Sequence, residues 1–287
     1  MRYEAPQTTA DAVSLLSGTR GHVHLLAGGT DLIVRMKGGF IEPDLIIDIK
    51  RIKAMHTIKK TTEGFSIGAA VSCSKLCANK ALRKAWPGLV EAAALIGSDQ
   101  IQGRCTIVGN LCNASPAADS TPALIAAGAQ ARIAGPKGER LLPVEKIPTG
   151  PGKNSLKKGE LVVSIELPAR EARSADAYIR HTPRTEMDIA VVSAGVNLTV
   201  DRKNIITGAR VTLGAVAPTA LRVKAAEKAL TGKTLDDSTL VELATACSAA
   251  CNPIDDKRGT VAYRTRVAGV LAKRAAQSAF TRAGGKS

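Results

Sequence analysis

The stretch VHLLAGGTDL at residues 23–32 decides how the amino-terminal part of this chain folds. Its first four residues form a short apolar run that predicts a strand, and Gly28 and Gly29 predict a turn directly after it. Leu32, Ile33 and Met36 then recur at helical spacing, and residues 44–49 form a second apolar run. The stretch therefore predicts a strand, a glycine turn, a helix and a second strand, in that order.

Similar patterns continue along the chain and predict mixed α and β structure. A helix is expected to begin at residues 8–11 and to end at Gly18. Further strands are expected at 64–69, 129–134, 161–167, 177–180, 189–200 and 205–216, and further helices near 72–85, 88–96, 222–230, 238–250 and 260–282. Between Ile96 and Pro122, glycine and asparagine replace regular periodicity, which predicts a functional loop without secondary structure.

The length of 287 residues favours two domains. Hydrophobic residues make up 45% of the chain and aromatic residues only 2%, so the core must be aliphatic. The polar, charged segment 168–176 predicts a boundary, with one domain at 1–172 (subdomains at about 1–55 and 56–172) and another at 173–287. Because strands precede helices in the second domain, we expect a segregated α+β architecture there.

The chain carries a formal net charge of +15, from 40 Lys and Arg against 25 Asp and Glu. Such an excess calls for a negative partner, either a nucleic acid, a lipid surface, a polyanionic cofactor or an acidic protein. The basic residues are scattered and aromatic residues are scarce, which favours a docking partner or a phosphate ligand over nucleic acid. No signal peptide and no membrane span is predicted, so we expect a cytoplasmic protein.

The cysteines and histidines do not form a metal-binding pattern. Six cysteines stand at Cys73, Cys77, Cys105, Cys112, Cys247 and Cys251, with no C-x-x-C motif and no histidine at zinc-like spacing. We expect ordinary reduced thiols and no metal. His22, His24, His56 and His181 are scattered, and we expect surface or structural roles for them.

Two segments have the composition of phosphate-binding loops. In residues 27–31 the glycines let the backbone approach an anion closely, although a lone Gly-Gly pair more often forms a plain tight turn. In residues 104–119, Thr106, Gly109 and Asn110 offer a second such turn, and two glycine turns could hold both phosphates of a pyrophosphate. Asp119 suits either a sugar or polyol hydroxyl or the cap of a helix at 120–127.

These two segments resemble the two FAD loops of the medium subunit of molybdenum hydroxylases, the family of the flavoprotein subunits of carbon monoxide dehydrogenase, nicotinate dehydrogenase and bacterial xanthine dehydrogenase. The resemblance covers nearly the whole chain in the right order. Further motifs that carry it are VVSIELP at 162–168, the Arg184-x-x-x-Asp188 spacing, GAVAPT at 214–219 and DDKRGTVAYR at 255–264.

The resemblance implies a fold and a set of cofactor ligands. The fold would be α+β, with a two-lobed PCMH-type FAD-binding domain followed by a C-terminal domain of antiparallel strands and then helices, which completes the pocket. Non-covalent FAD would contact Leu25, Leu26, Ala27, Gly28, Gly29, Thr30, Asp31 and Leu32 of the first loop; Thr106, Gly109 and Asn110 of the second; and Ile101, Asp119, Val162 and Arg180. Val108 stands where relatives often have glycine, so its backbone must adopt an ordinary conformation.

The resemblance also implies a function, which is electron transfer without a catalytic residue in this chain. A large molybdopterin-binding subunit would oxidise the substrate, and a small subunit with two [2Fe–2S] clusters would pass electrons to this FAD and on to an external acceptor. A dimer of heterotrimers is the expected assembly. The alternatives are a self-sufficient FAD-dependent reductase on the related fold and a basic nucleic-acid-binding module.

Overall fold

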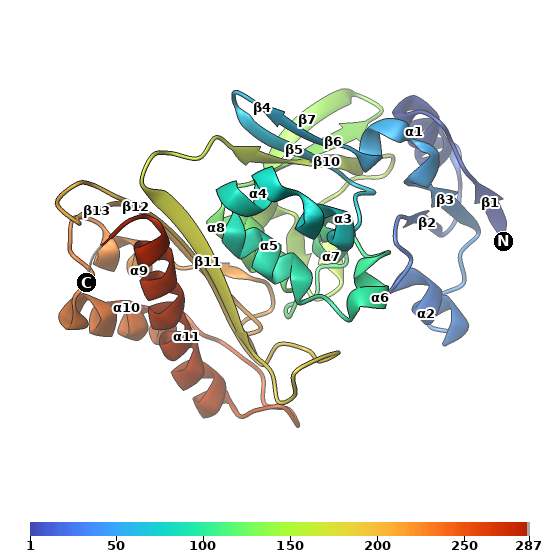
Figure 1. Cartoon of the computed structure of the whole chain (residues 1–287). Coiled ribbons are helices and arrows are strands. Elements are labelled where there is room, and N and C mark those ends of the chain that lie inside the picture. The colour runs from blue at the N-terminus through green and yellow to red at the C-terminus, as the bar shows by residue number, and fades with distance from the viewer. Residues whose placement is uncertain (286–287) are drawn as a thin grey trace.

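A computed structural model describes residues 1–285 and begins with a small parallel unit (Figure 1). Its elements are β1 (Arg2–Glu4), α1 (Thr9–Gly18), β2 (Val23–Leu26), α2 (Leu32–Lys37) and β3 (Leu45–Asp48). The three strands form a sheet in the order β1-β3-β2, with both pairs parallel. The predicted order of strand, turn, helix and strand is confirmed. The central β3 is buried, whereas β2 lies at an edge of this sheet.

A second unit is built around a five-stranded antiparallel sheet in the order β4-β5-β10-β6-β7. Its strands are β4 (Ile58–Thr61), β5 (Gly64–Gly68), β6 (Gln130–Gly135), β7 (Gly138–Pro143) and β10 (Leu161–Pro168), and a two-stranded ribbon pairs β8 (Pro148–Gly150) with β9 (Lys153–Asn154). β10 is central and buries the apolar side chains Leu161, Ile165 and Leu167. The short strands β4, β7, β8 and β9 were not predicted, because their sequences lack a continuous apolar run.

Six short helices lie beside the five-stranded sheet (Figure 1). They are α3 (Cys73–Ala78), α4 (Lys80–Ala85), α5 (Pro87–Ala94), α6 (Asp99–Gln102), α7 (Ile107–Cys112) and α8 (Ser120–Ala126). The prediction of a loop without secondary structure between Ile96 and Pro122 is wrong. Helices of four to seven residues are too short to show a period, and tertiary contacts stabilise them here.

The C-terminal unit has antiparallel strands followed by helices, as predicted. The strands β11 (Ser174–His181), β12 (Val192–Val200), β13 (Ile206–Gly214) and β14 (Leu221–Arg222) form one sheet in chain order, and α9 (Lys224–Leu230), α10 (Asp237–Ala249) and α11 (Val261–Arg282) follow. A stripe of fully buried alanines on α11, including Ala268, Ala272 and Ala275, lets this helix lie close to β11 and β12. The fold class is thus α+β.

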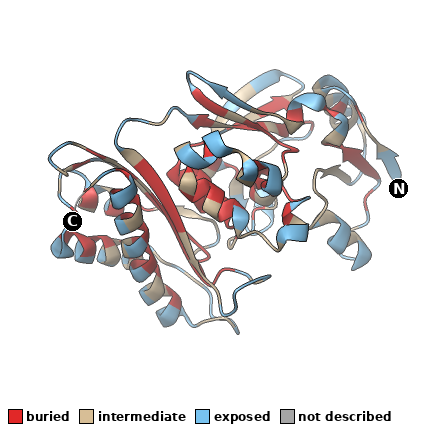
Figure 2. Ribbon diagram, viewed as in Figure 1, coloured by how far each residue is buried: buried red, intermediate tan, exposed pale blue. Residues whose placement is uncertain are grey.

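Strand β11 connects the two larger units. It runs between the helices of the second unit and α11 (Figures 1 and 2). Gly88 at the start of α5 lies so close to β11 that a Cβ there would come 2.8 Å from the Ala177 backbone. Asp176 accepts a hydrogen bond from the Leu89 N–H and pairs with Arg170, whose guanidinium stacks on Trp86. These contacts fix the C-terminal unit against the rest of the chain.

In residues 1–285, no helix is both long enough and apolar enough to cross a bilayer.

Candidate functional site

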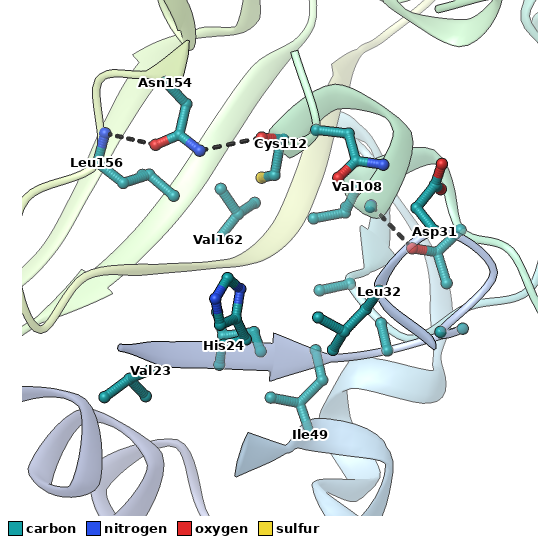
Figure 3. A pocket seen from close by; sticks show the side chains of 18 of the residues that line it. Val23, His24, Asp31, Leu32, Ile49, Val108, Cys112, Asn154, Leu156 and Val162 are labelled. Carbon is teal, nitrogen blue, oxygen red and sulfur yellow. Dashed lines mark hydrogen bonds between the residues drawn. The ribbon is translucent and has the colours of Figure 1, made fainter. Parts of the chain in front are cut away.

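A cavity of about 650 Å³ lies between the amino-terminal unit and the five-stranded sheet. This volume is in the range of small-molecule and cofactor sites, about 300–1,000 Å³. Figure 3 shows the edge strand β2 along one wall, with α7 and Val162 of β10 opposite. The third wall is the loop at residues 152–160. Asn154 anchors this loop by donating from Nδ2 to the Cys112 carbonyl at 3.0 Å.

The first glycine loop is shaped by its contact with the second loop. A Cβ on Gly28 would come 2.1 Å from the Arg104 carbonyl oxygen, so the two loops pack backbone against backbone there. Gly29 has φ of +78°, a left-handed conformation that strains any residue with a side chain. Both glycines also line the cavity. Gly28 and Gly29 are therefore required by the tight turn itself, and they are also placed where a ligand in the cavity would meet them.

The second loop is the beginning of a helix rather than a glycine turn. Thr106 caps α7, because its Oγ1 accepts from the Gly109 N–H at 2.9 Å. Val108 lies within α7, in the ordinary backbone conformation that a β-branched residue requires. Apart from its chain neighbours and the backbone of α7, a Cβ on Gly109 would contact Thr106 Oγ1 at 3.1 Å, a close contact to which the Thr106 hydroxyl would have to adjust. A side chain at Gly109 would therefore project into the cavity.

Most of the predicted site residues meet at this cavity. The lining includes Leu25, Ala27, Gly28, Gly29, Thr30, Asp31, Leu32, Thr106, Gly109, Asn110 and Val162. Four predicted residues lie outside the lining, namely Leu26, Ile101, Asp119 and Arg180. All lining residues lie between Leu16 and Val162, so the C-terminal unit, expected to complete the pocket, contributes none of them.

Asp119 and Arg180 instead form a buried ion pair with each other. Arg180 donates to Asp119 Oδ2 at 2.7 Å, and the Tyr178 hydroxyl donates to Oδ1 at 2.8 Å. Burial raises the pKa of Asp119 to about 6, against the opposing effects of Arg180 and Tyr178. Asp119 precedes α8 but its side chain makes no capping hydrogen bond, so the capping alternative is wrong. The cluster connects α8 to β11, and a role of either residue in binding FAD stays a prediction.

The charged residues of the lining leave the cavity positive. Arg35, Lys157 and Lys158 line it, and within residues 1–285 no ion pair involves their side chains. Glu160 is neutralised by a two-point contact with Arg140, which lowers the pKa of this carboxyl to about 2. Asp31 adds one negative charge. The three cations and the carboxylate of Asp31 together leave a net positive charge of about two, which would balance the two negative charges of a pyrophosphate.

Several lining residues were not among the predicted ligands. His24 was expected at the surface or in a structural role, but it lines the cavity, and Figure 3 shows its ring turned from β2 toward Val162. Val108, Asn154 and Leu156 also line the cavity. His24 reaches the cavity because β2 is the edge strand of its sheet. The sequence carries no signal for the order of strands in a sheet, so this position could not be predicted. Burial, helped by Arg35 and His22, lowers the pKa of His24, so it is neutral at neutral pH.

We expect binding of a pyrophosphate ligand to be coupled to protonation of His24. An anion in the cavity favours the imidazolium, so the pKa of His24 rises on binding, and affinity increases as pH falls through this pKa. FAD titrations at pH 8 and pH 6 should show about threefold to tenfold tighter binding at pH 6, equivalent to at most about 1.4 kcal/mol. His24→Gln should lose this difference, whereas His56→Gln, away from the lining, should keep it. An equal pH dependence in His24→Gln and the parent would contradict the coupling.

The chain is similar to known proteins over nearly its whole length. Residues 1–170 match the family model described as the FAD binding domain in molybdopterin dehydrogenase, and residues 177–279 match the CO dehydrogenase flavoprotein C-terminal domain. The chain is 34% identical to the carbon monoxide dehydrogenase medium chain of Hydrogenophaga pseudoflava, over 98% of this chain and 97% of that protein. It is 28% identical to the xanthine dehydrogenase FAD-binding subunit of Escherichia coli O157:H7, over 99% and 97%.

A solved structure is similar over the same length. The carbon monoxide dehydrogenase of Hydrogenophaga pseudoflava, in a form that lacks the Mo-pyranopterin moiety of the molybdenum cofactor, contains a chain that superposes with a TM-score of 0.94. The match has 34% identity and covers 98% of both chains.

Proposed function

The chain belongs to the family of FAD-binding subunits of molybdenum hydroxylases, and on that premise we propose that it is the electron-transfer subunit of such an enzyme. Electrons would come from [2Fe–2S] clusters of a small partner subunit, after a large molybdopterin subunit oxidises the substrate. They would leave this chain to an external acceptor. The observation that carries the proposal is the positive cavity between two loops of the FAD-binding domain.

The residues of the cavity fit FAD. The N–H groups of Ile107 and Val108 belong to the first turn of α7, where no partner exists within the helix. Together with the glycine backbone of the first loop, they would bind the pyrophosphate. The positive charge of Arg35, Lys157 and Lys158 balances its two negative charges. The predicted ligands that line the cavity are therefore proposed to hold FAD, and the apolar wall at Leu25, Ile49 and Val162 to exclude water from it.

The chain's own residues position the cofactor rather than react with it. FAD, when bound, takes electrons singly from iron–sulfur centres and can release them in pairs. Asn154 and the Thr106 cap hold two walls of the cavity in place, and the Arg140–Glu160 pair fixes the turn that carries Lys157 and Lys158. No residue is required to accept a proton from the organic substrate, because that substrate is oxidised in the large subunit.

Assembly with two acidic partners would account for the net charge of +15, most of which FAD cannot balance. We propose a dimer of heterotrimers in the cytoplasm. Charges at the rim of an interface mainly speed association and are screened by salt, whereas an apolar interface core determines dissociation. The association rate should therefore fall as salt is added, while the dissociation rate changes far less.

Co-purification tests the proposed function. The tagged chain, expressed with its neighbouring subunits and purified at low salt, should carry flavin and should bring molybdenum and iron with it. Its flavin should bleach on addition of the substrate of the complex. A yellow monomer without either metal, purified at low salt from a host that expresses the whole operon, would contradict the proposal.

A further inference from the structure

Two cysteines far apart in the sequence meet behind the wall of the cavity. Cys105 directly precedes the Thr106 cap and lines the cavity, with 5% of its surface exposed. Cys73, the first residue of α3, lies behind it and is fully buried. The Cys73 N–H donates to the Cys105 carbonyl at 2.8 Å, and the two thiols are near enough to shift each other's pKa. Both are free cysteines.

This arrangement suits a disulfide. A disulfide needs neighbouring backbones and Cβ atoms that face each other. The main-chain hydrogen bond shows that the two backbones are neighbours, and the effect of each thiol on the pKa of the other places the two sulfur atoms near each other. Cys247 and Cys251 differ from this pair, because Cys247 lies in the last turns of α10, Cys251 follows the end of that helix, and the Cys251 thiol donates to the Cys247 carbonyl.

The two thiols differ in reactivity and in access. The hydrogen bond from Cys73 lowers the pKa of Cys105, against burial and the charge of Asp31, whereas the same contact raises the pKa of Cys73. Since the thiolate is the nucleophile, Cys105 reacts first. Cys105 lines the cavity and is otherwise buried, so a small oxidant that enters the cavity lies next to it. Cys112 also lines the cavity, but burial raises its pKa to about 12.

We propose that Cys105 is an oxidation site that the cofactor covers, and that it forms a disulfide with Cys73 when the cavity is empty. The oxidant is a peroxide. The Cys105 thiolate attacks one oxygen of hydrogen peroxide and the O–O bond breaks. Hydroxide is the leaving group, and Cys105 becomes a sulfenic acid. The Cys73 sulfur then displaces the sulfenic oxygen, which leaves as water with the thiol proton. In total two thiols lose two electrons and two protons, and one peroxide becomes two waters.

Protection by the cofactor rests on the proposed function, whereas formation of the disulfide does not. The experiment uses the full chain in two forms, one with its flavin and one stripped of flavin, with flavin content measured by absorbance. Both forms receive a few equivalents of hydrogen peroxide and are digested without reductant for mass spectrometry. The Cys73–Cys105 peptide should appear in the stripped form at least tenfold faster, and adding FAD before peroxide should restore protection.

Two variants test whether Cys105 forms the disulfide, and three results would contradict parts of the inference. Cys105→Ser should abolish the linked peptide, whereas Cys251→Ser, in the C-terminal unit, should leave its yield unchanged. A stripped protein that takes up flavin again but never forms the Cys73–Cys105 peptide would overturn this inference and leave the proposed function intact. Equal rates of oxidation with and without bound flavin would overturn the protection. A chain that binds no flavin would contradict both the proposed function and the protection by the cofactor. Formation of the disulfide could still be measured in that flavin-free protein.

Discussion

Gly109→Val is expected to give a folded protein that has lost most of its affinity for FAD. Gly109 lines the cavity, and beyond the backbone of α7 and its chain neighbours its Cβ would meet the Thr106 hydroxyl at 3.1 Å, so the valine methyl groups would occupy space proposed for the pyrophosphate. α7 already contains Ile107 and Val108, which shows that its backbone accepts β-branched residues. Overpacking of this kind costs about 1–3 kcal/mol, which corresponds to a loss of affinity of about 5- to 150-fold. Titration of stripped protein with FAD measures it.

Gly103→Val is the matched control for this variant. Gly103 lies six residues earlier, outside the lining, and a Cβ there would make only ordinary contacts with backbone oxygens at 3.4 and 3.8 Å. It should bind FAD like the parent. Gly109→Ala, with a smaller side chain, should fall between the two. Gly28→Val is a poorer test, because its Cβ would collide with the Arg104 carbonyl and disturb the loops themselves. Full flavin content in Gly109→Val would refute the placement of the second loop.

Asp119→Ala is expected to lower the free energy of unfolding by about 3–5 kcal/mol, the usual cost of leaving a buried charge without its partner. The side chain of Arg180 is only 5% exposed and would keep a single contact, at 3.4 Å, with the Asp188 carbonyl. The Tyr178 hydroxyl would also lose its acceptor. Urea unfolding at neutral pH measures the loss. Asp119→Asn should cost less, since its amide oxygen still accepts from Arg180.

The pH dependence of stability identifies the same group. The pKa of Asp119 is about 6 in the folded protein, above the ordinary value of 3.8, so the folded state binds the proton more tightly. The contribution of Asp119 to stability is therefore greatest below pH 4 and falls as pH rises toward 6. Asp119→Asn should lack this part of the pH dependence. If its stability varies with pH as in the parent, another group is responsible.

Flavin affinity of the same variants separates the two roles of Asp119. If Asp119 also accepts from a hydroxyl of FAD, as predicted, Asp119→Ala should bind FAD about 1–3 kcal/mol more weakly under conditions where it stays folded. Lower stability with unchanged FAD affinity would contradict the ligand role and leave the ion pair with Arg180 as the function of this residue.

The sequence predicts the helices and strands well where the hydrophobic pattern is long and where elements that are consecutive in the sequence also contact each other. The strand, glycine turn and helix at 23–37 and the Ala-rich helix at Val261–Arg282 are examples. The helices α6 and α7 are too short for a periodic signal, and the edge strands of the second sheet carry mixed polar sequence. The site shows the same limit. Local motifs indicate both loops, but the pair Asp119–Arg180 and the position of His24 depend on how distant strands are ordered.

A structure of the purified chain with FAD bound tests the central claim most directly. We predict electron density for the pyrophosphate between the backbone of Gly28–Thr30 and the first turn of α7, with Arg35, Lys157 and Lys158 around its charge. Density for FAD outside this cavity, or a pyrophosphate without contact to either loop, would contradict the account.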